Sequence, residues 1–185
     1  MKKYFFLILF FALYVINIQA AENKMILKLK DGNVEIDLFP DVAPNHVARI
    51  KTLVKNKAYD GVVFHRVIDG FMAQTGDVEF GNSSSENYNL ERAGQGSSNL
   101  PNLKSEFSNL PHERGTLSMA RSANPDSANS QFFICFAPSP HLDRNYTVFG
   151  KVVKGMEFVD KIKKGDGSNG SVEDPDKIIS ISLAK

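Results

Sequence analysis

The sequence predicts one mainly β domain, an antiparallel barrel or sandwich with helical covers. Strand-like stretches outnumber helical ones, and the two types do not alternate as they would in a parallel doubly wound sheet. The 185 residues suffice for one domain with a sizeable core, and contents of 42% hydrophobic and 23% charged residues are ordinary for a soluble globular protein. The formal net charge of +1 indicates neither nucleic acid nor an acidic surface as a partner.

The N-terminal stretch is predicted to be a secretory signal peptide. Two lysines precede an apolar run over residues 5–16, and small residues follow at Ala20 and Ala21. The run is shorter than the roughly 20 apolar residues that span a bilayer, and an uncleaved membrane anchor is the alternative interpretation. We therefore expect a signal peptide over residues 1–20, a domain over residues 21–185, and a periplasmic or secreted protein.

A β-hairpin and a helix are expected at the start of the domain. Residues 25–30 and 33–38 alternate apolar and polar side chains, and the Asp-Gly pair between them is typical of a tight hairpin turn. From Pro44 onward the apolar period becomes helical, and proline suits the first turn of a helix. The apolar residues expected on one face of this helix are Val47, Ile50, Leu53 and Val54.

Short strands and long loops are expected in the rest of the chain. Two apolar runs, residues 64–68 and 71–74, are joined by an Asp-Gly pair. Residues 78–114 are rich in glycine, serine, asparagine and charge, which is typical of loops. A short amphipathic helix that begins near residue 155 is expected to end at Gly165. The remaining strands are predicted over residues 115–120, 131–137, 146–153 and 177–184.

The sequence contains fragments of motifs from other protein classes, but their spacing or their position in the chain argues against each of them. Gly165, Gly167 and Gly170 have the spacing of a dinucleotide-binding loop, but they follow a helix instead of a strand, so a flexible loop is the better interpretation. The four histidines show no metal-ligand spacing, and none has obvious partners for a nucleophilic triad. The single cysteine, Cys135, allows no intrachain disulfide and is interpreted as a core residue of an apolar strand.

Two long polar side chains, Arg66 and Gln74, stand in otherwise apolar strands. Either residue alone would be interpreted as a side chain at the edge of a sheet. Because alternate residues of a strand share a face, Met72 and Gln74 are expected on one surface. The predicted surface is an apolar pocket edged by amide and guanidinium donors, without a general base or a metal, and it comprises Arg66, Phe71, Met72, Gln74, Gln131 and Phe133.

Four segments resemble the signature segments of the cyclophilin-type peptidyl-prolyl cis-trans isomerases: FHRVIDGFMAQTGD, GTLSMA, NSQFFICFA and LDRNYTVFGKVVKGMEFVDKI. The resemblance covers residues 25–184 and is strongest to bacterial, exported members. It implies a closed eight-stranded antiparallel β-barrel capped by two α-helices, with Arg66 as the catalytic residue on the outer face. The substrate-binding residues that it implies are Phe71, Met72, Gln74, Ala120, Gln131, Phe133, His141, Leu142 and Tyr146.

The activity that this resemblance implies is rotation about X–Pro peptide bonds, without a cofactor or a metal, and assistance to the folding of exported proteins. The barrier of roughly 20 kcal/mol is amide resonance, and a guanidinium fixed near the prolyl nitrogen stabilises the twisted transition state more than the planar amide. The implied partners are proline-containing peptides and unfolded or folding proteins. Nucleic acid and stable membrane insertion after signal cleavage are not implied, and the protein would be a monomer.

Two positions depart from the best-known eukaryotic pattern of this family. His141 stands where a tryptophan is common, and Tyr146 stands where a histidine is common. Tyr146 keeps an aromatic face and a polar tip, so proline binding is expected to survive. The missing indole donor predicts weak binding of cyclosporin, and Arg121 is expected to alter which residues are preferred beside the proline.

Two other functional classes are alternatives. A peptide-binding chaperone module would hold proline-containing segments without significant turnover, and a degenerate module of this kind often lacks the arginine that this chain has at Arg66. A β-barrel carrier would need an interior ligand cavity, whereas the phenylalanine and isoleucine content of the strands predicts a filled interior.

Overall fold

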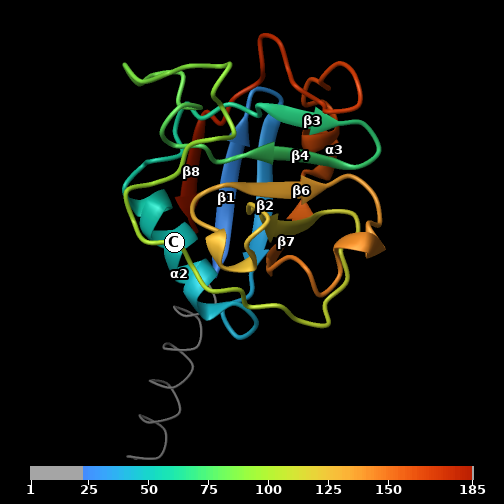
Figure 1. Ribbon diagram of the computed structural model, residues 1–185. Helices are drawn as coiled ribbons and strands as arrows, with labels where there is room; N and C mark the ends of the chain where they lie inside the picture. Colours follow the sequence, from blue (N-terminus) through green and yellow to red (C-terminus); the bar gives the residue numbers. More distant parts are fainter. Residues whose placement is uncertain (1–22, 185) are drawn as a thin grey trace, which may run out of the picture.

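The computed structural model describes residues 23–184 of the chain (Figure 1). The predicted signal peptide, residues 1–20, lies outside the described residues. None of the helices within residues 23–184 has the length and apolar character needed to cross a membrane.

Eight strands form one antiparallel sheet in the order β3-β4-β6-β5-β7-β2-β1-β8 (Figure 1). Every strand overlaps a stretch for which a strand is predicted, so the mainly β prediction is confirmed. The strands are β1 (Lys24–Leu29), β2 (Gly32–Leu38), β3 (Arg66–Ile68), β4 (Met72–Thr75), β5 (Thr116–Met119), β6 (Phe132–Cys135), β7 (Val148–Lys154) and β8 (Ser180–Leu183).

The sheet is an open half-barrel, and the prediction of a closed barrel is wrong. Strands β3 and β8 form its two edges. Near these edges the described chain makes isolated bridges instead of a ladder, between Val63 and Lys177 and between Arg66 and Ser171. The segment that joins α3 to β8 contains three glycines and Pro175. Glycine weakens a strand and proline has no N–H to donate, so this segment does not complete the barrel.

Within residues 23–184, two α-helices accompany the sheet, as predicted. Helix α2 (Pro44–Lys55) packs beside β8, and helix α3 (Met156–Asp160) packs beside β2. Helix α3 ends at Asp160, before the predicted end at Gly165, and beyond it the N–H groups of Lys163 and Gly165 donate to Asp176 and Val67 instead of to a helical turn. The predicted apolar face of α2 is confirmed, since Val47, Ile50, Leu53 and Val54 are all buried.

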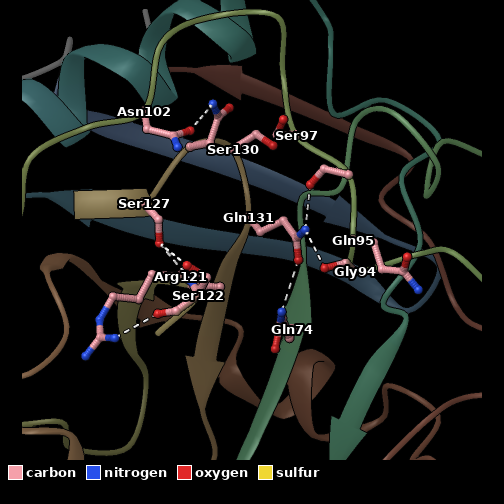
Figure 2. Close-up of a pocket in the computed structure, with 13 residues that line it drawn as sticks. Gln74, Gly94, Gln95, Ser97, Asn102, Arg121, Ser122, Ser127, Ser130 and Gln131 are labelled. Atoms are coloured by element: carbon pink, nitrogen blue, oxygen red, sulfur yellow. Dashed lines mark hydrogen bonds between the residues drawn. The ribbon is translucent and has the colours of Figure 1, made fainter. Parts of the chain in front are cut away.

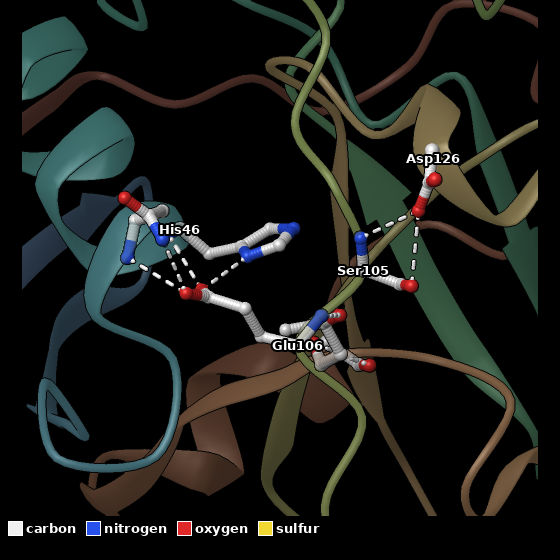
Figure 3. Close-up of polar contacts among 7 residues, drawn as sticks. His46, Ser105, Glu106 and Asp126 are labelled. Carbon is white, nitrogen blue, oxygen red and sulfur yellow. Dashed lines mark hydrogen bonds and ion pairs between the residues drawn. The ribbon is translucent and has the colours of Figure 1, made fainter.

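A long segment between β4 and β5 lacks helix and strand, as predicted for residues 78–114. Carboxylates fasten it to the rest of the fold (Figure 3). Glu106 accepts hydrogen bonds from the backbone N–H groups of Asn45 and His46 and from both of their side chains, at 2.6–3.2 Å. Glu106 therefore caps the N-terminus of α2, where Ala43 offers no side-chain cap.

Side chains alternate across the sheet between two apolar clusters. In β6, Phe132 and Ile134 belong to the interior core, whereas Phe133 and Cys135 belong to a smaller cluster on the outer face. Cys135 is fully buried, as expected, but it supports the outer cluster and not the interior. Large fully buried side chains fill the interior, which argues against a barrel carrier; they include Tyr59, Phe64, Phe132 and Phe149.

Candidate active site

A pocket of about 210 Å³ lies on the outer face of the sheet, over β3, β4 and β6. Eight of the ten predicted site residues line it together with Arg121. The other two lie beside it, because Gln131 lines a neighbouring pocket and the ring of His141 packs on Phe71 at 5.3 Å. The lining residues are Arg66, Phe71, Met72, Gln74, Ala120, Arg121, Phe133, Leu142 and Tyr146.

The floor of this pocket is apolar and well ordered by packing. Met72, Phe133 and Leu142 are buried in the outer-face cluster, with exposures of 1%, 5% and 7%. The ring of Tyr146 meets Phe133 edge-on, with centroids 5.8 Å apart. Phe71 is partly buried against the same cluster. The pocket can therefore bind a small apolar ring and exclude water from it.

Arg66 lies at one side of this apolar floor, on the edge strand β3. Its Nε donates to the backbone carbonyl of Asn169 at 2.8 Å, and its Nη1 donates to Gln74 Oε1 at 3.3 Å. Nη1 also lies 3.8 Å from the sulfur of Met72. These contacts fix the guanidinium plane next to the pocket. The loop around Asn169, interpreted from the sequence only as flexible, therefore supports the main polar residue of the site.

A chain of amides continues from Arg66 across the sheet. Figure 2 shows the part of this chain that joins Gln74 and Gln131. Gln74 Nε2 donates to Gln131 Oε1 at 3.0 Å. Gln131 Nε2 donates in turn to the carbonyls of Gly94 and Gly96, at 3.0 and 2.8 Å. Each glutamine accepts a hydrogen bond through its Oε1 and donates one through its Nε2 to the next group of the chain. These hydrogen bonds fix the orientations of Arg66, Gln74 and Gln131 relative to one another.

Asp77 anchors the far end of this chain. It is fully buried, and its Oδ2 accepts the backbone N–H groups of Gly94 and Gly96 at 2.7 and 2.9 Å. Its Oδ1 accepts the N–H groups of Glu79 and Phe80. A side chain at position 96 would collide with Asp77, which explains the glycine there. The sequence interpretation does not include Asp77, because its partners are backbone groups.

A second, polar pocket of about 400 Å³ adjoins the first one (Figure 2). The two pockets share Gln74, Ala120 and Arg121, so together they form one continuous groove. Amides, hydroxyls and backbone groups make up the polar pocket. Its other lining residues are Gly94, Gln95, Gly96, Ser97, Asn102, Ser122, Ser127, Asn129, Ser130 and Gln131.

Arg121 stands where the two pockets meet. Its Nε and Nη2 both donate to the carbonyl of Asn145, at 3.0 and 2.8 Å, and its Nη1 donates to the carbonyl of Ser122 at 2.9 Å. The guanidinium carbon lies 4.4 Å from the centre of the Tyr146 ring. The side chain is therefore held in place by hydrogen bonds and by a cation–π contact.

His112 lies beneath the apolar pocket and does have the partners of a triad, contrary to the sequence interpretation. Its Nδ1 is 2.9 Å from Asp143, and its Nε2 is 3.0 Å from the hydroxyl of Ser118. Burial lowers the pKa of His112, and the hydrogen bond to Asp143 opposes that effect. Ser118 is fully buried and donates its proton to the carbonyl of Thr147, so this cluster supports the fold and offers no accessible nucleophile.

The pocket suits chemistry in which no covalent bond is formed. Its lining contains neither a carboxylate nor a histidine nor a cysteine that could act as base or nucleophile. Within residues 23–184, no three metal-ligating side chains gather into a possible metal site. What the site offers is an apolar floor beside a fixed, directional cation, which can stabilise negative charge or a lone pair that develops in a bound group.

Comparison with known proteins agrees with this geometry. The family model described as cyclophilin type peptidyl-prolyl cis-trans isomerase/CLD matches residues 24–183. A Brucella suis protein named "Probable peptidyl-prolyl cis-trans isomerase" is 60% identical over 163 residues, which cover 88% of this chain and 83% of that protein. The peptidyl-prolyl cis-trans isomerase of Acinetobacter baylyi is 40% identical over 181 residues, covering 91% and 90%.

Solved structures of the same kind are also similar. A cyclophilin from Hirschia baltica has a TM-score of 0.74 and 26% identity, covering 88% of this chain and 74% of that one. A Cryptosporidium parvum cyclophilin type peptidyl-prolyl cis-trans isomerase, solved in the presence of the dipeptide Ala-Pro, has a TM-score of 0.73 and 25% identity, covering 88% and 99%.

Proposed function

The chain belongs to the cyclophilin-type peptidyl-prolyl cis-trans isomerase family, and on this premise we propose that Arg66 is the catalytic residue of its isomerase site. As a member of this family, the protein catalyses rotation about X–Pro peptide bonds. The observation that carries the proposal is the position of the Arg66 guanidinium, which Asn169 and Gln74 hold beside the apolar pocket.

The apolar pocket would hold the proline ring of the substrate. Phe71, Met72, Phe133 and Leu142 supply most of its apolar surface. Binding there fixes the prolyl nitrogen and leaves the residue before the proline free to rotate. The apolar contacts are the same in the planar and twisted forms, so they bring the substrate to the site but do not by themselves lower the barrier.

Arg66 would act on the nitrogen of the twisted amide. In the planar amide the nitrogen lone pair is delocalised, and in the twisted transition state it is recovered and can accept a hydrogen bond. Among the described residues Nη2 of Arg66 has no hydrogen-bond partner, so it remains available as a donor. A donor that is used mainly in the transition state raises the rate, and each tenfold acceleration requires about 1.4 kcal/mol of this preference.

The substrates would be proline-containing segments of unfolded or folding proteins. The related C. parvum protein was solved in the presence of the dipeptide Ala-Pro, which supports a proline-containing peptide as the ligand class. The groove is open to solvent along two adjoining pockets, so an extended segment can lie in it. Uncatalysed X–Pro isomerisation takes tens of seconds or longer and often limits refolding.

Export would place this activity in the periplasm or outside the cell. The lysines, the apolar run over residues 5–16 and the small residues at Ala20 and Ala21 support a cleaved signal peptide. Mass spectrometry of the N-terminus of the protein recovered from its native host tests this. We expect a first residue at or near Ala21, and an intact Met1 in the membrane fraction would instead support an uncleaved anchor.

Turnover of a proline tetrapeptide by residues 21–185 tests the role of Arg66. We expect Arg66→Ala to lower kcat/KM at least tenfold while thermal unfolding stays cooperative. Arg114→Ala is a matched control, because Arg114 is exposed and pairs with Asp160 away from the groove. Wild-type turnover by the Arg66 variant would refute the mechanism. Peptide binding without turnover by the wild-type protein would show a peptide-holding module instead.

A further inference from the structure

The side chains that line the groove include positively charged ones and no negatively charged ones. The two adjoining pockets are lined by Arg66 and Arg121, and neither pocket is lined by an aspartate or a glutamate. Neither arginine takes part in an ion pair within residues 23–184. Their hydrogen-bond partners are carbonyl and amide oxygens and a sulfur, which satisfy donors but leave the net charge in place. The lining of the groove therefore carries two positive charges and no negative one, and the carboxylates nearest to it, Asp77 and Glu79, bind backbone N–H groups behind the polar pocket.

Arg121 is better placed than Arg66 to act on the residues beside the proline. Arg121 lines both the apolar pocket and the polar pocket. A peptide that places its proline in the apolar pocket and extends into the polar pocket would therefore lie next to Arg121. Its guanidinium is fixed by Asn145, Ser122 and the ring of Tyr146, so a bound carboxylate would not have to order a mobile side chain. The side chain is partly buried, which reduces screening by water and salt.

We propose that Arg121 makes the groove selective for X–Pro segments that carry an acidic side chain within two residues of the proline. The proposal rests on the isomerase function argued above. A guanidinium has five N–H donors, and the contacts to the carbonyls of Asn145, Ser122 and Ala123 leave one N–H of Nη2 available. A carboxylate on the substrate would receive a charge-assisted hydrogen bond and would neutralise one of the two charges of the groove.

A purely structural role for Arg121 makes a different prediction. The same contacts join the turn at Ser122 to the turn at Asn145 and hold Tyr146 against the pocket, so loss of Arg121 could loosen the site for every substrate. Such a loss would lower turnover of acidic and neutral peptides by the same factor. The ratio of kcat/KM for an acidic peptide to kcat/KM for the matched neutral peptide cancels this common factor, so it reports the electrostatic contribution of Arg121 alone.

The test compares tetrapeptides that differ only by Glu or Gln at the first or second residue before the proline, or at the residue after it. We expect the ratio of kcat/KM for Glu over Gln to reach about three- to tenfold at one of these positions in low salt. The ratio should approach one at 1 M NaCl. Arg121→Gln should bring the ratio close to one at low salt, and Arg121→Lys should restore part of it, because lysine keeps the charge.

A matched control removes one positive charge elsewhere on the surface. Lys151→Gln, on the exposed side of β7, should keep the wild-type ratio. A ratio of one in the wild-type protein, or a preference that persists in Arg121→Gln, would overturn the proposal, and the second result would assign the preference to Arg66. Turnover of the Gln peptides is measured in the same series, so failure of the isomerase function is distinguished from failure of this selectivity.

Discussion

Arg66 and Gln74 are direct cross-strand partners, and their side chains meet on the outer face of the sheet with Nη1 and Oε1 3.3 Å apart. The antiparallel register of β3 and β4 brings them together, although they are eight positions apart in sequence. Gln74 is itself held by Gln131, which is held by backbone carbonyls. The orientation of the arginine therefore depends on a chain of amides.

Gln74→Ala is expected to lower kcat of peptide isomerisation about three- to tenfold. The substitution removes the acceptor that fixes Nη1 of Arg66 and leaves the arginine present but less ordered. KM should change less than kcat, because the apolar floor is retained. Asn99→Ala is the control, since Asn99 is exposed and lines neither pocket of the groove. An unchanged kcat in Gln74→Ala would show that Asn169 alone orients Arg66.

Glu106→Gln is expected to lower the free energy of unfolding by about 1–3 kcal/mol at neutral pH. Burial acts to raise the pKa of Glu106, but the hydrogen bonds from His46 and Asn45 outweigh it and hold this pKa below the usual range. A depressed carboxyl pKa contributes stability that is present above the ordinary pKa and is lost as the pH falls through the folded-state pKa. The difference between the two proteins should therefore shrink on acidification.

Urea unfolding of both proteins across a pH series measures this difference. Glu86→Gln is a suitable control, because Glu86 is exposed. Equal stability of wild type and Glu106→Gln at neutral pH would contradict the capping role of Glu106. A difference that stayed constant down to acidic pH would contradict the assigned pKa shift.

Cys135 is expected to resist thiol reagents until the protein unfolds. It is fully buried beneath the apolar pocket, and burial, followed by the negative charge of Asp143, raises the pKa of the thiol to about 12. Because it is the single cysteine of the chain, labelling reports on one site. Maleimide labelling in increasing urea should follow the unfolding transition, and rapid labelling of the native protein would show that the outer cluster opens readily.

His141→Trp is expected to tighten inhibition by cyclosporin about ten- to a hundredfold. The imidazole packs on Phe71 at the edge of the pocket, with ring centroids 5.3 Å apart. An indole would add apolar area and a fixed N–H donor, together equivalent to roughly 1.5–3 kcal/mol. Titrating cyclosporin against both proteins in one isomerase assay gives the two inhibition constants. Equal constants would show that residue 141 does not set the sensitivity.

Local patterns predict most elements of the fold but not how the sheet ends. Alternation of apolar residues locates the strands, and the face of α2 follows from a helical period. Closure of the barrel depends on pairing between β3 and the chain before β8, segments about a hundred residues apart, and no local pattern records that pairing. Beyond the end of α3, the N–H of Gly165 likewise bonds to Val67, a residue far away in the sequence.

The sequence predicts the side chains of the site, but it does not predict the backbone groups that hold those side chains in place. Most of the motif residues line one pocket, with Arg66 at its side and Gln131 hydrogen-bonded to Gln74. The carbonyl of Asn169 and the N–H groups held by Asp77 have no signature in sequence, because any residue can supply a backbone group. The roles of the individual site residues stay predictions that the measurements above are designed to test.

The most direct test of the account is to measure the isomerisation rate of the enzyme-bound peptide separately from its affinity, in wild type and in Arg66→Ala. Exchange between bound cis and trans forms of a labelled proline peptide can be followed by NMR, and the Kd comes from the same titration. We predict that the rate on the enzyme falls at least tenfold while the Kd changes less than about threefold, because Arg66 acts mainly on the twisted amide. A loss of affinity with an unchanged rate on the enzyme would contradict it.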